Sequence, residues 1–114
     1  MPQVPPPNSA IAELASALGE DSARELAELF LTSFEAVLRN LNAGDHEERK
    51  RAAHSLKSTA RIVGASALSN RMAELESRLT NTAGDVTPED LAGTIEEFER
   101  IAILLRAYAR QAGA

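Results

Sequence analysis

The helical pattern of the chain is clearest in TPEDLAGTIEEFERIAILLRAYA, residues Thr87 to Ala109. It opens with a threonine at a capping position, a proline at the first helical position and two acidic residues that favour the positive end of a helix dipole. Its apolar residues then recur at intervals of four and three residues: Leu91, Ile95, Phe98, Ala102, Leu105 and Ala109. This pattern predicts a long amphipathic helix that turns these residues toward the core of a bundle.

Two more amphipathic helices are predicted directly before this stretch. One extends from Ser66 to Asn81, and its apolar residues are spaced by four, three and four: Leu68, Met72, Leu75 and Leu79. The other begins after a cap at Asp45, with Glu48 at the third position, and extends to Val63. Gly64 follows at once and is expected to end it.

Two helices are also predicted in the first third of the chain. The longer extends from Ser22 to Asn42, because Ser22 and Glu25 have the spacing of a capping box. Its predicted buried stripe has apolar residues three and four apart: Leu26, Leu29, Phe30, Phe34, Val37, Leu38 and Leu41. The shorter helix extends from Ser9 to Leu18, with Asn8 or Ser9 as its cap and Gly19 just past its end.

The expected fold class is all-α, an up-down-up-down four-helix bundle with a short additional N-terminal helix packed at one end. A length of 114 residues suits one domain, which we place at residues 9–114. Residues 1–8 contain four prolines and are predicted to be a proline-rich linker or tail. Such a start suggests a piece of a longer protein.

The composition excludes several classes of function. A formal net charge of −5 argues against a nucleic-acid partner, and the absence of cysteine excludes disulfides and thiol chemistry. The longest apolar run, Ile101 to Leu105, is far too short to insert into a membrane, and no signal peptide precedes the first helix. We therefore expect a cytoplasmic location.

One residue of the third helix is a candidate for chemistry. Its apolar residues, Ala53, Leu56, Ala60 and Val63, share one face, and a polar face lies about 130° away. That polar face carries His54, Lys57, Ser58 and Arg61. A neutral imidazole turned toward water is a good nucleophile for an activated phosphoryl group, and the nearby cations suit a phosphate.

The run AAHSLKSTARIVGASAL, residues 52–68, resembles the signature of histidine-phosphotransfer (Hpt) domains. In that signature H-x-L-K-G is followed by a glycine ten residues after the histidine, and the matching positions are His54, Leu56, Lys57, Ser58 and Gly64. The likeness extends to the pair Leu75 and Glu76 and so covers most of the chain. Ser58 replaces the usual glycine, from which we expect an altered receiver preference or rate rather than loss of function.

The resemblance implies that His54 is the phosphoacceptor and that Lys57 stabilises the phosphate. Ser58 would be the small residue that gives access, Arg61 an electrostatic support and Gly64 a structural glycine of the motif. The implied partners are response-regulator receiver domains, between whose aspartates the chain relays a phosphoryl group. The receiver would supply Mg²⁺, and this chain would bind no cofactor and have no kinase activity of its own. A hybrid sensor histidine kinase, in cis or in trans, is a further partner that the family suggests.

The competing interpretation is a non-catalytic helical adaptor, in which the bundle binds a partner protein and His54 is incidental. The other histidine, His46, lies eight residues earlier beside acidic residues and is interpreted as a surface residue. The two histidines lack the spacing of a helical metal pair, so no metal site is expected. We expect the chain to be a monomer.

Overall fold

Helices account for all of the regular structure in residues 4–81 and 84–110, which are the residues that the computed structural model describes. Their bounds are Ser9–Leu18 (α1), Glu20–Ala43 (α2), His46–Ile62 (α3), Ser66–Asn81 (α4) and Pro88–Ala109 (α5). The all-α prediction is confirmed, and each predicted helix is present. Of the predicted linker, residues 1–3 lie outside the described residues, and residues 4–8 lead into α1 without helical structure.

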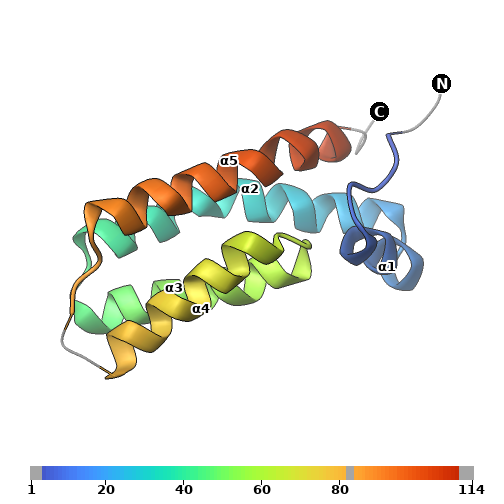
Figure 1. Ribbon diagram of the computed structural model, residues 1–114. Coiled ribbons are helices and arrows are strands. Elements are labelled where there is room, and N and C mark those ends of the chain that lie inside the picture. Colours follow the sequence, from blue (N-terminus) through green and yellow to red (C-terminus); the bar gives the residue numbers. More distant parts are fainter. Residues whose placement is uncertain (1–3, 82–83, 111–114) are drawn as a thin grey trace.

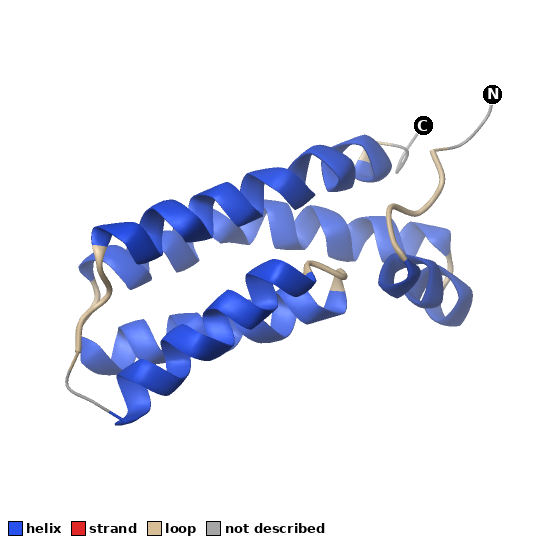
Figure 2. Ribbon diagram, in the orientation of Figure 1, coloured by secondary structure: helices blue, strands red, loops and turns tan. Residues whose placement is uncertain are grey.

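The four long helices run up, down, up and down, and α1 packs at one end, beside the start of α2 (Figure 1). Helices and their short connections make up the whole of the described chain (Figure 2). α3 packs most extensively against α4, while α2 contacts both α3 and α5. The contact between α4 and α5 is sparser, so α3 and α4 form the tightest pair of the bundle.

Two helix starts match their sequence signals closely. The Asp45 side chain accepts the amide proton of Glu48 (2.9 Å), and the Glu48 side chain accepts that of Asp45 (3.1 Å). Thr87 and Asp90 form the same reciprocal pair at the start of α5, with Pro88 at its first position. Both capping boxes satisfy amide groups that the helix itself leaves without an acceptor.

The predicted capping box at Ser22 and Glu25 is wrong. α2 already begins at Glu20, because Gly19, with a φ of 95°, turns the chain sharply after α1. Glu20 accepts a hydrogen bond from the hydroxyl of Tyr108 in α5 (3.0 Å). Ser22 therefore lies inside the first turn of α2 and is not its cap. The hydrogen bond between Tyr108 and Glu20 stabilises the two additional residues at the start of the helix.

The core is built from small and branched aliphatic side chains, with a stacked pair of rings from Phe34 and Phe98 whose centroids are 3.6 Å apart. Two predicted core residues are exposed: Leu29 at 62% and Ile95 at 41%. On α2 the buried face follows Ala23, Ala27 and Phe30, which lie well away from Leu29 around the helix. On α5 the buried face includes Thr94, Leu105 and Tyr108, and Ile95 lies at the edge of that face.

Gly64 ends α3, and Asn8, the cap of α1, packs against it. With a φ of 80° it closes a Schellman motif, in which the amide of Ala65 donates to the carbonyl of Ala60 (2.8 Å). The Asn8 side chain donates to the carbonyl of Val63 (2.9 Å) and accepts from the amide of Ile11 (2.9 Å). A Cβ at position 64 would collide with that Asn8 side chain. The glycine therefore permits α1 to dock on the end of α3.

Substitution Gly64→Ala is expected to lower the free energy of unfolding by about 2 kcal/mol or more, because it adds a steric collision to an unfavourable φ. Gly19→Ala measures the backbone cost without a collision, since Gly19 also has a positive φ but open space around it. With a ψ of 156° its conformation is essentially restricted to glycine, so its loss should be about 1 to 3 kcal/mol. Denaturant titration measures both, and a loss for Gly64→Ala that is the same in an Asn8→Ala background would contradict the role given to Asn8.

Candidate functional site

His54 lies near the middle of α3, and its side chain is 60% exposed. Its neighbours Ala53, Leu56 and Ala60 are buried in the bundle core and fix which face of α3 meets solvent. The predicted orientation of the histidine is therefore confirmed. An imidazole at this position is open to another protein without any rearrangement of the helix.

The carboxylate of Glu76, on α4, connects two side chains of α3. Its Oε2 lies 2.7 Å from Nδ1 of His54, and its Oε1 accepts a hydrogen bond from Nζ of Lys57 at 2.6 Å. Met72, Leu75 and Leu79 are all buried, which places Glu76 at the edge of the core beside α3. The buried Ser69 hydroxyl also donates to the carbonyl of Lys57 (2.9 Å), so α4 is held in register with this part of α3.

The contacts of Glu76 determine which nitrogen of His54 carries the proton. The hydrogen bond from Lys57, together with that from His54, holds the pKa of Glu76 below the ordinary carboxyl value, against the opposing effect of partial burial. An ionised carboxylate only accepts hydrogen bonds, so Nδ1 of His54 is the donor. In the neutral ring Nε2 then has the free lone pair, and it lies on the side of the ring away from Glu76.

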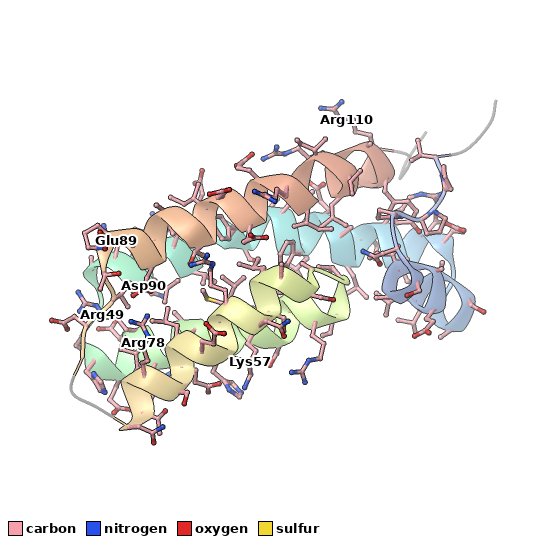
Figure 3. The ribbon with its side chains drawn as sticks, in the orientation of Figure 1. Arg49, Lys57, Arg78, Glu89, Asp90 and Arg110 are labelled. Atoms are coloured by element: carbon pink, nitrogen blue, oxygen red, sulfur yellow. The ribbon has the colours of Figure 1, made fainter. Side chains whose placement is uncertain are left out.

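The ring of His54 lines a shallow depression that extends along α3 toward its N-terminus. The residues around it come from α3 and α4: Glu47, Lys50, Arg51, His54, Glu76 and Thr80. Lys50 forms an ion pair with Glu47 across one turn, with a distance of 3.5 Å. Figure 3 shows Lys57 well along the α3–α4 pair, apart from the charged residues Arg49, Arg78 and Asp90 near the α4–α5 connection.

The other predicted site residues have different positions. Ser58 and Arg61 are exposed on α3, and neither lines the depression beside His54. Gly64 lies at the far end of α3, packed against Asn8. Sequence reasoning named Glu76 only as part of a resemblance and gave it no role. Its register beside Leu75, on the helix that follows the histidine, is the signal that would have indicated one.

Within the described ranges, no group of three or more histidine, aspartate or glutamate side chains is arranged to hold a metal ion. No helix among these residues is both long and apolar enough to cross a membrane.

The fold and the site together define a helical carrier that presents one histidine to a partner protein. The chain belongs to the Hpt domain family, whose family model matches residues 10–111. Members of this family transfer phosphoryl groups through a histidine in phosphorelays; they are carriers rather than kinases, and receiver domains are their partners. Searches of curated proteins and of solved structures gave no significant match.

The ionised state of Glu76 makes a testable contribution to stability. A carboxyl whose pKa is lowered by folding stabilises the protein above its ordinary pKa and loses this effect as the pH falls through the lowered value. We expect Glu76→Gln to reduce the free energy of unfolding by about 1 kcal/mol near neutral pH. The difference in stability from the unaltered chain should narrow as the pH falls below the ordinary carboxyl pKa and should close once the pH has passed the lowered pKa of Glu76.

Glu74→Gln provides the control for this measurement, because Glu74 is an exposed carboxylate on the same helix. Its stability should follow that of the unaltered chain across the whole titration. A difference between Glu76→Gln and the unaltered chain that stays constant with pH would show that the hydrogen bonds of Glu76 do not depend on its charge.

Proposed function

We propose that His54 is the residue that carries the phosphoryl group and that Nε2 is the nitrogen that accepts it. The observation that carries this proposal is the contact of Nδ1 with the ionised Glu76, in a side chain that is otherwise exposed. The contact occupies one ring nitrogen and leaves the other turned toward a visiting partner. A histidine that contributed only to solubility would not require a partly buried carboxylate hydrogen-bonded to its ring.

The transfer proceeds by in-line attack on an aspartyl phosphate. The Nε2 lone pair forms a bond to phosphorus while the bond from phosphorus to the aspartyl oxygen breaks, and the aspartate leaves as a carboxylate. The ring keeps its Nδ1 proton and acquires positive charge, which the Glu76 carboxylate stabilises at 2.7 Å. The reverse reaction, onto the next aspartate, uses the same contacts.

The remaining motif residues assist at a distance from the bond that forms. Lys57 keeps Glu76 ionised, and its ammonium is also close enough along the helix to favour a phosphoryl group on His54. Ser58 lies one turn after His54 on α3, and its small side chain leaves room for the partner. Arg61 contributes positive charge. Gly64 acts through the packing of α1 on α3.

The wider setting follows from this chemistry. The partner receiver supplies the aspartyl phosphate and the Mg²⁺ that neutralises its charge, and this chain binds no cofactor. We place the relay in the cytoplasm, with residues 9–114 acting as one monomeric unit. A hybrid sensor histidine kinase, in cis or in trans, is the class of protein that would feed phosphate into it.

The direct test is phosphate uptake from receivers phosphorylated on aspartate. His54→Gln should abolish uptake and leave folding and receiver binding nearly unchanged, because the His54 side chain is largely exposed. The product on the unaltered chain should be labile in acid and stable in base, as a phosphoramidate is and a phosphoserine is not.

His46→Gln is the matched control, since it removes the other exposed histidine of the same helix. It should take up phosphate at the rate of the unaltered chain. Retained labelling in His54→Gln would refute the assignment, and an adaptor that only bound a partner would show no labelling of any variant.

A further inference from the structure

We infer that Arg51 is the residue that holds the phosphoryl oxygens while the group is on His54. This inference rests on the proposed function and assigns a role to a side chain that the motif does not include. Arg51 lies one turn before His54 on α3 and lines the same depression as the imidazole. Its assignment depends on the direction of side chains on a helix and on the partners of the neighbouring cations.

Helical side chains lean toward the N-terminus of their helix, so each covers the turn before its own Cα. The His54 ring therefore lies over the turn that contains Lys50 and Arg51, and not over the turn that contains Ser58 and Arg61. The residues that line the depression agree with this direction, since they include Lys50 and Arg51 but not Arg61. A group attached to Nε2 would extend toward the earlier turn.

Two of the cations near His54 already have partners. Lys57 donates to Glu76 at 2.6 Å, and Lys50 is paired with Glu47 at 3.5 Å. Arg51 is exposed and has no ion pair or side-chain hydrogen bond with any residue in 4–81 or 84–110. It is thus the guanidinium beside the ring that can bind a new anion without breaking an existing contact.

Asp45 is near enough for its charge to attract Arg51, but no ion pair or hydrogen bond joins the two side chains. Asp45 and Glu48 accept each other's amide protons in the capping box, and Glu47 faces Lys50. A guanidinium offers two parallel N–H groups that match two oxygens of a phosphoryl group, which an ammonium cannot do. Arg51 would then bind these oxygens in the transition state and in the phosphorylated product.

A small-molecule donor separates this role from docking of a receiver. Phosphoramidate can phosphorylate a histidine directly: the new N–P bond forms as the donor's own N–P bond breaks and ammonia leaves. We expect Arg51→Ala to slow uptake from phosphoramidate by about three- to tenfold. Arg51→Lys keeps the charge but loses the two parallel N–H groups, so it should recover only part of the rate. ³¹P NMR follows the uptake, and thermal unfolding should be unchanged in both variants.

Arg39→Ala is the matched control, because Arg39 is an exposed arginine on α2 that lines the groove between α2 and α5. It should take up phosphate at the rate of the unaltered chain. Equal rates for Arg51→Ala and Arg39→Ala would overturn the role of Arg51, and full recovery of the rate by Arg51→Lys would overturn the contact with two phosphoryl oxygens. If the unaltered chain takes up no phosphate on His54 from a phosphorylated receiver either, the proposed function itself fails, which is a separate outcome.

Discussion

The carboxylate of Glu76 holds two side chains of α3 at once, and the chemistry of the site depends on this one contact. Its two oxygens lie 2.7 Å from Nδ1 of His54 and 2.6 Å from Nζ of Lys57. Lys57 keeps the carboxylate ionised, and the ionised carboxylate fixes the proton of the imidazole on Nδ1. In the proposed transfer, the nucleophilic nitrogen would therefore be selected before a partner binds. The carboxylate beside the ring would also stabilise the charge that the ring acquires during that transfer.

That contact joins two different helices, so it requires a fixed register between α3 and α4. The buried leucine and methionine side chains of α4 fix most of this register, and the hydrogen bond from Ser69 to the carbonyl of Lys57 adds a polar contact between the two helices. The Schellman turn at Gly64 sets the point at which the chain reverses. A change at Gly64 would therefore act on the site through the turn between α3 and α4 and not through contact with a phosphoryl group.

Local signals in the sequence predicted all five helices of the described residues, because caps, prolines and apolar spacing act over a few residues. The capping boxes at Asp45 and Thr87 and the outward direction of His54 are of this kind. The errors arose where partners distant in sequence decide the outcome. Tyr108 holds the start of α2 at Glu20, and the packing of α5 against its neighbours turns Ile95 outward. The link from Glu76 to His54 spans 22 residues, so spacing within one helix could not reveal it.

The most direct test of this account is the protonation state of the His54 ring in the folded protein. A long-range ¹H–¹⁵N correlation spectrum distinguishes the two nitrogens, before and after phosphorylation. We expect the unphosphorylated neutral ring to carry its proton on Nδ1 and the phosphoryl group to appear on Nε2. A neutral ring protonated on Nε2, or a phosphoryl group on Nδ1, would contradict the role that Glu76 has here.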